Sequence, residues 1–456
     1  MNQSAEHPET QPDERLAKAL LPAAESLRLH RQYRGKVQMA LKCPIRGFDD
    51  FSYWYTPGVA APCREIQADR SLSYEYTNRG NTIAIVSDGT RVLGLGDIGP
   101  EAGMPVMEGK SLLFKYLGGV DAVPLCLDTK DPDELVRTVE LLAPSFGGVN
   151  LEDIAQPKCF RVLDRLRASL SIPVWHDDQQ GTATVVVAAL WNALQVVGKR
   201  PEQVRIALIG VGAANVATFR LLCASGFAAG GIRACDRQGC LHRGRTDLDQ
   251  MRDTFVDKWR ICESSNEEGV TDGIEAALRG ADVCIAFSSS GPGVIRPEWI
   301  KGMARDAIVF ACANPVPEIW PWEAREAGAR IVATGRGDFP NQVNNSLVFP
   351  GLFRGTLDVR ARRISDEMAL AAARALSAAA AADGRLSEEH IVPRMDQWQT
   401  APQIAAAVGL QAQAQGLASL VKSRDQLVEE ATRAIQSARA VSPQAVEQAS
   451  SLLRSP

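Results

Sequence analysis

Two pairs of neighbouring carboxylates have the residue types and placement that metal chemistry requires. Glu152 and Asp153 follow the segment GGVNL, and Asp177 and Asp178 follow IPVWH, so each pair stands beside the end of a predicted strand. Mg²⁺ and Mn²⁺ are hard cations that take several oxygen ligands from separate loops. The alternative is that each pair lies in a solvated turn or caps a helix.

A tyrosine and a lysine are candidates for proton transfer. Tyr55 immediately precedes a rigid Thr-Pro-Gly turn, which can hold its hydroxyl toward a cleft. A buried aromatic at a turn is the alternative. Lys110 begins an otherwise apolar helix in the segment VMEGKSLLF, where partial burial can lower its pKa enough for it to act as a base. A solvated lysine at a helix start is the other interpretation. His176 is expected to be a core or capping histidine.

The glycine pattern GxGxxG occurs literally once, between Gly94 and Gly99. A dinucleotide loop must lead straight into a helix whose N-terminal amides hold the pyrophosphate. Pro100, Gly103 and Pro105 follow here instead. We therefore predict that this segment is a tight loop near an active site and that it does not bind a dinucleotide.

A second glycine-rich segment has the setting that a dinucleotide site needs. The segment IALIGVGAANVATF has the pattern of a strand, a tight turn at Gly210 and Gly212, and an apolar helix, although Asn215 stands where Gly or Ala is usual. The next predicted strand ends at Asp236, close to the interval expected for a carboxylate that binds the adenosine ribose. This pattern predicts a nicotinamide cofactor rather than a plain strand-to-helix turn.

The residues around Asp236 leave the choice between NAD and NADP open. The charge of Asp236 favours NAD because it would repel a 2′-phosphate. Arg237, Arg243 and Arg245 follow closely and would neutralise such a phosphate.

The elements that must position these residues alternate between β-branched and amphipathic segments, which predicts an α/β fold. A second block, which begins near residue 204, has the succession of strands and loops that is typical of a doubly wound parallel sheet. No strand is predicted after 331–333, and the chain from about residue 365 has helical periodicity. Strands are predicted at 82–88, 122–128, 171–177, 204–209, 230–236, 281–288 and 307–315, and helices at 108–119 and 132–144.

Composition narrows the class of protein. The chain has 456 residues, and 50 Lys and Arg against 54 Asp and Glu give a net charge of -4 without a long run of one sign, which argues against nucleic acid as a partner. The most apolar segment, 182–198, is interrupted by Asn192 and Gln195 and predicts a buried helix rather than a membrane span. Ten cysteines without a CxxC pair indicate reduced, mostly buried thiols. We therefore expect a cytoplasmic protein with no membrane partner.

Between about Tyr53 and about Ala418 the chain resembles the malic enzyme family, in its short bacterial type without a phosphotransacetylase-like domain. The resemblance implies oxidative decarboxylation of L-malate to pyruvate and CO₂, with reduction of NAD or NADP and with Mg²⁺ or Mn²⁺. The matching segments, in the family's order, are YTPGVAAPCREI, VLGLGDIGPEAGMPVMEGKSLLFK, FGGVNLEDIAQPKCF, IPVWHDDQQGTA and FPNQVNNSLVFPGLFRGTLDVRA.

The resemblance also implies roles for single residues. Lys110 matches the base that removes the C2 hydroxyl proton, Asp177 the acid that supports this lysine, and Tyr55 the acid that protonates C3. The implied metal ligands are Glu152, Asp153 and Asp178. The implied substrate-binding residues are Arg91, Asn314 and Asn345. The implied cofactor-binding residues are Gly210, Gly212, Ala213, Asn215, Asp236, Arg237 and Asn314.

The resemblance predicts four parts and a homodimer or larger homo-oligomer. They are a helical and polar N-terminal extension (1–30), a malic enzyme catalytic domain (31–180), a Rossmann-type NAD(P)-binding domain (181–418) and a helical tail (419–456).

Two other activities share most of these motifs. A malolactic enzyme would convert malate to lactate and CO₂, and a catalytically silent paralogue would bind a dinucleotide or a dicarboxylate. The retained Tyr55, Lys110 and three carboxylates argue against the silent paralogue, because a binding protein needs no proton donor. Departures from the family at Asn215, Gln180 and Val316 leave cofactor preference and substrate tolerance open.

Overall fold

The computed structural model describes residues 12–382 and 384–440. The helix α1 (Pro12–Tyr33) belongs to a compact unit separate from Leu41–Val441 and is described by itself. It confirms the helical stretch expected in the N-terminal extension. Parts of that extension (1–11) and of the expected tail (441–456) lie outside the described residues.

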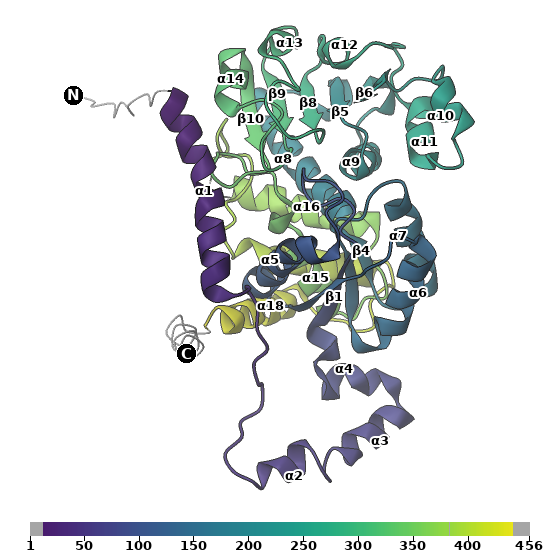
Figure 1. The fold of residues 1–456 in the computed structure, drawn as a ribbon, viewed down its shortest axis with the longest axis vertical. Coiled ribbons are helices and arrows are strands. Elements are labelled where there is room, and N and C mark those ends of the chain that lie inside the picture. The colour runs from purple at the N-terminus through teal and green to yellow at the C-terminus, as the bar shows by residue number, and fades with distance from the viewer. Residues whose placement is uncertain (1–11, 383, 441–456) are drawn as a thin grey trace, which may run out of the picture. The chain divides into compact units, whose positions relative to one another are not determined.

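A first sheet of four parallel strands, in the order β2-β1-β3-β4, occupies the earlier part of Leu41–Val441. Its elements are β1 (Thr82–Ser87), α5 (Pro100–Gly118), β2 (Asp121–Cys126), α6 (Pro132–Leu142), β3 (Gly148–Leu151), α7 (Lys158–Ser169) and β4 (Val174–His176). Ile83 and Ile85 of β1 join the core with residues of α5, whereas Ala84 and Val86 join the core with α6 and α7. Helices therefore cover both faces of this sheet (Figure 1).

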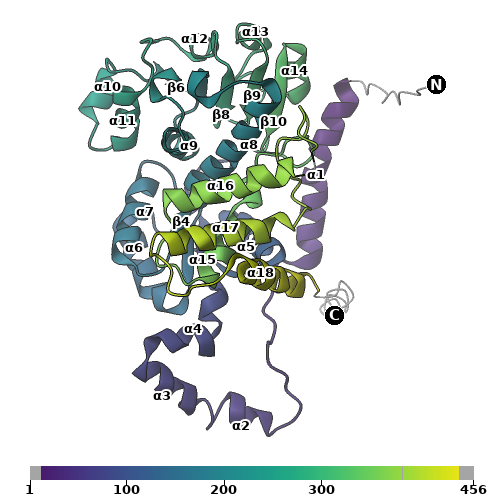
Figure 2. The same cartoon turned by 180° about the vertical axis from the view of Figure 1, so that it is seen from behind.

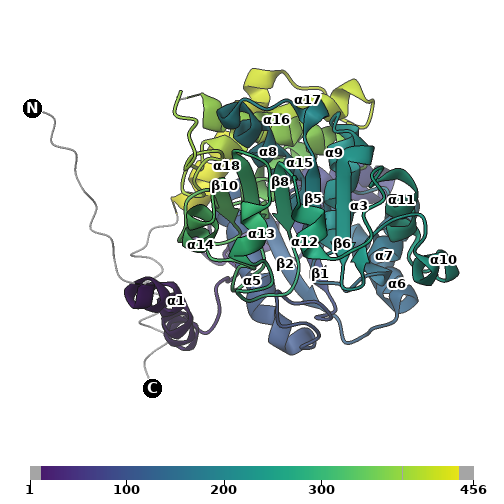
Figure 3. The ribbon, with the colours of Figure 1, turned by 90° about the horizontal axis from the view of Figure 1, so that it is seen from above.

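A second sheet of six strands has the order β10-β9-β8-β5-β6-β7. Its elements are β5 (Ile206–Ile209), α9 (Ala213–Ala224), β6 (Ile232–Asp236), β7 (Gly239–Cys240), α10 (Thr246–Gln250), α11 (Val256–Ser264), α12 (Ile274–Leu278), β8 (Val283–Ala286), α13 (Pro297–Lys301), β9 (Ala307–Ala311), α14 (Pro321–Glu326) and β10 (Ala329–Thr334). All pairs are parallel except β6 with β7, and Figure 3 shows these strands side by side. Because β5 lies between β6 and β8, the strand order reverses there, and doubly wound sheets bind ligands at the carboxyl ends of the strands beside such a reversal.

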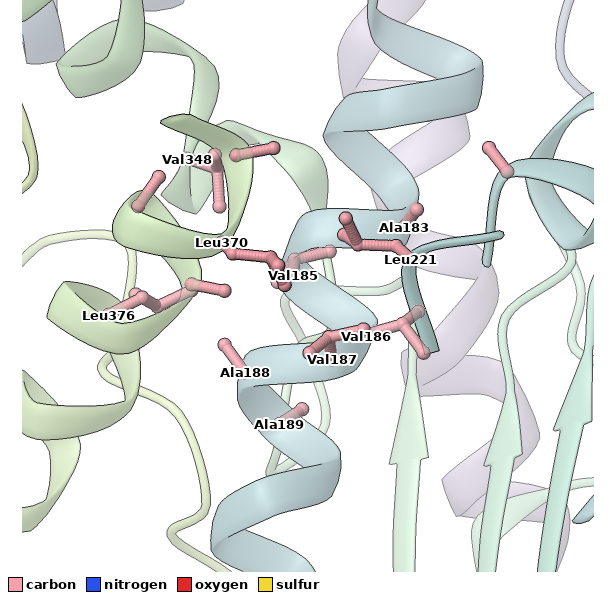
Figure 4. Packing of buried hydrophobic residues seen from close by; sticks show 14 of the residues in the cluster. Ala183, Val185, Val186, Val187, Ala188, Ala189, Leu221, Val348, Leu370 and Leu376 are labelled. Atoms are coloured by element: carbon pink, nitrogen blue, oxygen red, sulfur yellow. The ribbon is translucent and has the colours of Figure 1, made fainter. Parts of the chain in front are cut away.

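One apolar helix, α8 (Thr182–Val197), joins the two sheets. Together with the turn before it, Asp177–Val197 is long and apolar enough to cross a membrane, but 78% of its apolar window is buried inside the protein. Figure 4 shows Val185 of this helix between Leu221 of α9 and Leu370 of a later helix. The prediction of a buried core helix is therefore confirmed.

Four helices follow the second sheet, and the described chain has no further strand after β10, as expected. They are α15 (Phe349–Asp358), α16 (Asp366–Ala381), α17 (Thr400–Ala414) and α18 (Arg424–Arg439). They return to the first sheet, where Phe114 of α5 packs against Phe349 and Phe353 of α15, with ring centroids 4.5 and 5.2 Å apart. Figure 2 shows α15, α17 and α18 layered beside α5. The expected α/β fold with a helical C-terminal region is confirmed.

A segment before the first sheet is ordered but not buried. Residues 41–72, here called the arm, hold α2 (Asp50–Trp54) and α3 (Ala60–Ala68), and none of them is buried. The chain then enters α4 (Ser73–Tyr76) and β1. Figures 1 and 2 show α2 and α3 projecting from the sheets within Leu41–Val441.

Helices α15 and α17 pack at a distance that only glycine permits. A Cβ added at Gly355 would overlap the backbone of Ala405, whose Cα would be 2.8 Å away. Gly355→Ala should therefore lower the free energy of unfolding by about 1–3 kcal/mol, because an extra methyl group overpacks the contact. Urea denaturation measures this change.

Gly109→Ala in α5 is the matched control, because a Cβ there meets nothing within 4 Å. It should stabilise the helix by about 0.5–1 kcal/mol. Equal effects of the two substitutions would contradict the close packing of α15 on α17.

Candidate active site

The four acidic residues predicted from the sequence meet at one edge of the first sheet. Glu152 and Asp153 follow β3, and Asp177 and Asp178 follow the adjacent parallel strand β4. Oxygen atoms of Glu152, Asp153 and Asp178 lie within 4.8 Å of one another. Glu152 and Asp153 are buried, and Asp178 is partly exposed. We call these three residues the carboxylate triad.

Lys110 lies against this cluster from the neighbouring helix. Its ammonium is 3.1 Å from Glu152 Oε1, donates a short hydrogen bond to Asp177 Oδ2, and lies 4.6 Å from the ring centre of Phe349. The expectation that Lys110 begins a helix was wrong, because α5 starts at Pro100. Lys110 is therefore a buried, paired residue in the middle of a helix and not a solvated lysine at a helix start.

The charges of this cluster set the protonation of the lysine. Burial lowers the pKa of Lys110, but the negative charges of Asp177, Glu152 and Asp178 raise it by more, so the pKa lies above its ordinary value. The expectation of a lowered pKa was wrong for the protein alone. Its physical reason is that charge attraction at short range outweighs desolvation here.

Three of the four carboxylates in the cluster also have shifted pKa values. Burial, followed by the charge of Asp178, raises the pKa of Glu152 and of Asp153 well above their usual values, although Lys110 opposes this. Burial also raises the pKa of Asp177. Asp153 Oδ2 is buried and has no hydrogen-bond partner. Divalent cations such as Mg²⁺ and Mn²⁺ bind groups of hard oxygen donors that carry excess negative charge. The carboxylates of this cluster have both properties and therefore fit such a cation.

His176 is a core residue, which is one of the two positions expected for it, the core or a helix cap. It is fully buried, and this burial lowers its pKa to about 4. Its Nδ1 is 3.7 Å from Asp178 Oδ2. The imidazole is therefore neutral near pH 7 and adds no positive charge to the cluster.

The literal GxGxxG segment forms a loop at the rim of the cluster. The amide of Arg91 donates to the carbonyl of Asp153, which ties the loop to the carboxylate triad. The argument that no helix follows Gly99 was wrong, because Gly99 caps α5 and Pro100 is its first residue. Proline is tolerated there since the first N–H groups of a helix have no internal partner. The prediction of a tight loop near the site agrees with this position.

The second glycine segment forms the strand, turn and helix that were predicted. Gly210 has φ +84°, and a Cβ there would meet the carbonyl oxygen of Phe287 at 2.6 Å. Gly212 caps α9, and a Cβ there would meet nothing within 4 Å. The space beside Gly212, at the start of α9, is therefore open, and a helix start with such space fits a pyrophosphate.

Asn215 lies in this turn but faces inward. Its side-chain amide is buried and donates to the carbonyl oxygens of Ile209, Gly210 and Ile285. The asparagine thus joins the ends of β5 and β8 and fixes the Gly210 turn. This contact gives a structural reason for an asparagine where a smaller residue is usual.

Asp236 ends β6, as predicted, and one of the nearby arginines holds it. Arg245 donates to both carboxylate oxygens of Asp236, at 3.0 and 3.2 Å. Arg237 is exposed beside it, and Arg243 donates to a backbone carbonyl of Glu263. Positive and negative groups therefore still coexist where a 2′-hydroxyl or 2′-phosphate would lie.

The asparagines expected at the substrate lie where the two sheets approach each other. A Cβ at Gly94 would overlap the carbonyl oxygen of Asn314, so the loop after β9 touches the loop after β1. The Cβ of Asn345 would lie 3.3 Å from a Cβ at Gly181, in the turn that carries Asp177 and Asp178. Asn345 therefore borders the turn that carries Asp177 and Asp178, and Asn314 lies against the loop of Gly94.

Residues 34–132 and 129–167 match the model of the malic enzyme N-terminal domain, and residues 179–413 match that of the malic enzyme NAD-binding domain. The chain belongs to the malic enzyme family. The expected family is therefore confirmed.

Relatives within the family carry different cofactor names. The chain is 45% identical over 405 residues to the bifunctional malic/malolactic enzyme of Bacillus subtilis, an alignment that covers 89% of this chain and 96% of that protein. It is 48% identical to the NAD-dependent malic enzyme of Geobacillus stearothermophilus, with 79% and 73% covered. It is 45% identical to the NADP-dependent malic enzyme of Halomonas elongata, with 75% and 78% covered.

Solved malic enzyme structures share the fold. The crystal structure of the Entamoeba histolytica enzyme aligns with a TM-score of 0.93 at 46% identity, over 98% of this chain and 93% of that chain. That of the Pyrococcus horikoshii enzyme aligns with a TM-score of 0.88 at 45% identity, over 94% and 100%.

One predicted site residue is not brought to the cluster. Tyr55 lies on the arm, and 71% of its surface is exposed, so it is not the buried aromatic that was the alternative. No side-chain hydrogen bond joins it to another described residue. Within one chain the site therefore lacks its expected acid.

Sequence reasoning missed Glu318. This buried carboxylate accepts hydrogen bonds from the amide and hydroxyl of Ser288 and from the amide of Ala313. It therefore fixes the loops after β8 and β9, at the carboxyl ends of these strands. The signal was available as an acidic residue in the apolar segment CANPVPEI.

The raised pKa values of the carboxylates predict that protons compete with a metal. Mn²⁺ affinity should fall as the pH is lowered, and the fall should begin at a higher pH than for ordinary carboxylates, because the raised pKa values of Glu152 and Asp153 let these groups keep their protons to a higher pH. Titration calorimetry with Mn²⁺ in buffers of different ionisation enthalpy measures the affinity and the protons released.

Asp97→Asn is the matched control, because Asp97 is an exposed acid on the nearby loop that pairs with Lys130. It should leave the affinity unchanged, whereas Asp153→Asn should weaken it. An affinity that does not change with pH would contradict the assignment.

Proposed function

We propose that this chain catalyses the oxidative decarboxylation of L-malate to pyruvate and CO₂, with reduction of NAD or NADP and with Mg²⁺ or Mn²⁺. The observation that carries this proposal is the buried pairing of Lys110 with Asp177 and Glu152 beside the carboxylate triad. A proton-transfer group and a set of metal ligands thus share one edge of a sheet. The names of the relatives in Bacillus, Geobacillus and Halomonas support the same reaction.

The chain has suitable groups for each component. The carboxylate triad would hold the cation, and the turn at Gly210 and Gly212 with the first amides of α9 would hold the dinucleotide. Arg91 and the two asparagines, Asn314 and Asn345, would bind the substrate. When bound, the cation would polarise the C2 oxygen of malate and the nicotinamide would accept the hydride from C2.

The protein's own residues move the protons. Lys110 takes the proton of the C2 hydroxyl, and Asp177 holds the amine in position. Loss of CO₂ leaves an electron pair at C3, and we assign the proton that C3 needs to Tyr55. Lys110 can accept a proton only if it has first lost its own, so its raised pKa must fall in the loaded site. Neutralising the charges of Glu152 and Asp178 removes two of the causes of that rise, although the charge of Asp177, which contributes most to it, remains.

A malolactic activity is a second candidate. The Bacillus relative, which is named for both activities, aligns over nearly the whole of its length. The same residues would serve both reactions, since only the fate of pyruvate and reduced cofactor differs. The product, pyruvate or lactate, separates the two.

The cellular location and the oligomeric state are also part of this proposal. All ten cysteines are free and six of them are buried, as expected for reduced thiols, which supports a cytoplasmic location. We propose that the enzyme is a homodimer or a larger homo-oligomer.

The direct test follows reduction of NAD and of NADP with L-malate and Mn²⁺ by absorbance, with pyruvate and lactate quantified and a chelator as control. Pyruvate formed in step with reduced cofactor, and lost with the chelator, is the expected result. Lactate without net reduction would favour the malolactic reaction. If neither pyruvate nor lactate is formed, the proposal is contradicted.

Lys110→Ala should lower malate oxidation by at least about 10²-fold, because the hydroxyl proton loses its acceptor. Binding of the dinucleotide, measured by calorimetry, should be unchanged.

Lys115→Ala is the matched control, since Lys115 lies on the same helix and also pairs with an aspartate, Asp121. It should keep activity within about twofold. Near-normal oxidation by the Lys110 variant would remove this residue from the mechanism.

A further inference from the structure

Asp153 of the carboxylate triad has a conformation that other parts of the chain must hold. Its φ is +54°, in the left-handed region that residues other than glycine rarely adopt. The negative charge of Asp178 is also one of the causes of the raised pKa of Asp153, so the two carboxylates repel each other when both are ionised. Both effects favour movement of Asp153 away from the triad as long as no cation is bound.

Backbone contacts from a neighbouring loop oppose this movement. Residues 88–93, here called the β1 loop, follow β1, and β1 pairs with β3, the strand that precedes the triad residues Glu152 and Asp153. The amide of Arg91 donates to the carbonyl of Asp153 at 3.0 Å, and the amide of Leu93 donates to its carboxylate. The position of the β1 loop therefore sets the position of Asp153.

A buried hydroxyl joins the β1 loop to the chain on the far side of Asp153. Thr90 is only 7% exposed, and its Oγ1 accepts a hydrogen bond from the amide of Ala155 at 3.0 Å. The same hydroxyl donates to Asp88 Oδ1 at 2.6 Å. Because one hydroxyl makes both contacts, its loss would release the β1 loop from the segment after Asp153.

Asp88 is itself held by an ion pair. It is buried, and its Oδ1 also accepts from the amide of Thr90 at 3.1 Å. Its Oδ2 lies 2.5 Å from the ammonium of Lys158, the first residue of α7, and Figures 1 and 2 show α7 beside β4. A continuous set of contacts thus runs from α7 through Asp88 and Thr90 to both sides of Asp153.

Asp88 does not belong to the set of acids that can share an ion. Among the described residues that set consists of the carboxylate triad alone. The oxygens of Asp88 contact Thr90 and Lys158 instead. A buried carboxylate that is bound to a threonine and a lysine contributes geometry to the neighbouring site and not a metal ligand.

We propose that Asp88, Thr90 and Lys158 form a positioning relay, which holds Asp153 in the conformation in which the carboxylate triad binds a divalent cation. In the protein without the cation, the relay opposes the repulsion within the triad and keeps Asp153 near its final place. Binding of the cation then does not include the cost of ordering this loop, which raises the affinity. The inference rests on the proposed function for the presence of the cation.

Thr90→Val tests the relay, because it removes the hydroxyl, keeps a side chain of similar shape and leaves the net charge unchanged. Titration calorimetry of the full chain should show that the affinity for Mn²⁺ falls by about 10- to 100-fold. Thr90→Ser keeps the hydroxyl and should bind Mn²⁺ within about threefold of the wild-type affinity. A wild-type affinity in the Thr90→Val variant would overturn the proposal.

Thr356→Val is the matched control, because it removes a buried hydroxyl outside the relay. Thr356 is fully buried, and its hydroxyl donates to the carbonyl of Leu352 within α15 at 2.7 Å. Its loss should leave the affinity for Mn²⁺ unchanged, even where thermal denaturation shows that both valine variants are destabilised equally. An equal loss of Mn²⁺ affinity in the two valine variants would overturn the positioning role.

Lys158→Met is a second test that does not depend on the folding of the Thr90 variant. It removes a positive charge near the triad, so an effect of charge alone would strengthen Mn²⁺ binding. The relay predicts weaker binding, because Asp88 loses the partner that holds it. Lys130→Met should leave the affinity unchanged, since Lys130 forms an exposed ion pair with Asp97. Unchanged or tighter binding in the Lys158 variant would overturn the proposal.

The wild-type protein separates failure of the relay from failure of the proposed function. Wild-type protein that does not bind Mn²⁺ would contradict the metal site of the proposed function and the relay with it. Wild-type binding that is retained in full by Thr90→Val and Lys158→Met would contradict the relay alone.

Discussion

Buried negative charge at one edge of the first sheet is the constraint on which the rest of this structure depends. Four carboxylates from the ends of β3 and β4 lie together, and the ammonium of Lys110 pairs directly with two of them, Glu152 and Asp177. Removing such groups from water is costly unless they are paired. The raised pKa values of Glu152, Asp153 and Asp177 express this cost. A divalent cation would relieve it, which links metal binding, lysine protonation and catalysis through one set of charges.

The remaining elements hold this cluster at a junction. The helix α8 follows directly from the turn that carries Asp177 and Asp178 and leads into the second sheet. The helix α15 returns from the second sheet and packs Phe349 against α5 and over Lys110. The loops after β8 and β9 are fixed by Glu318. The Lys110 cluster and the glycine turn at Gly210 are thus joined by a continuous core.

The periodic and local features of the chain were predictable. The strands, the α/β class, the buried α8, the grouping of the acidic pairs and the turn at Gly210 follow from hydrophobic pattern and from the rule that parallel strands end at one edge. The place of Lys110 did not follow, because Pro100 and Pro105 were taken to exclude a helix, whereas Pro100 is the first residue of α5 and Pro105 lies inside it.

Other errors came from quantities that a sequence does not contain. The direction of the Lys110 pKa depends on distances to three carboxylates, since burial and attraction act in opposite senses. The inward direction of Asn215 depends on which carbonyls meet at the ends of β5 and β8. Nothing in the segment around Tyr55 says that it projects from the sheets, because its local turn is the same wherever the arm points.

The central claim is that the excess negative charge is a divalent cation site, and anomalous scattering from a crystal grown with Mn²⁺ tests it most directly. The account predicts one strong manganese peak within bonding distance of oxygens from Glu152, Asp153 and Asp178. Lys110 should lie beside this peak without coordinating the metal. A fully occupied manganese site elsewhere, with the carboxylate triad empty, would contradict the account.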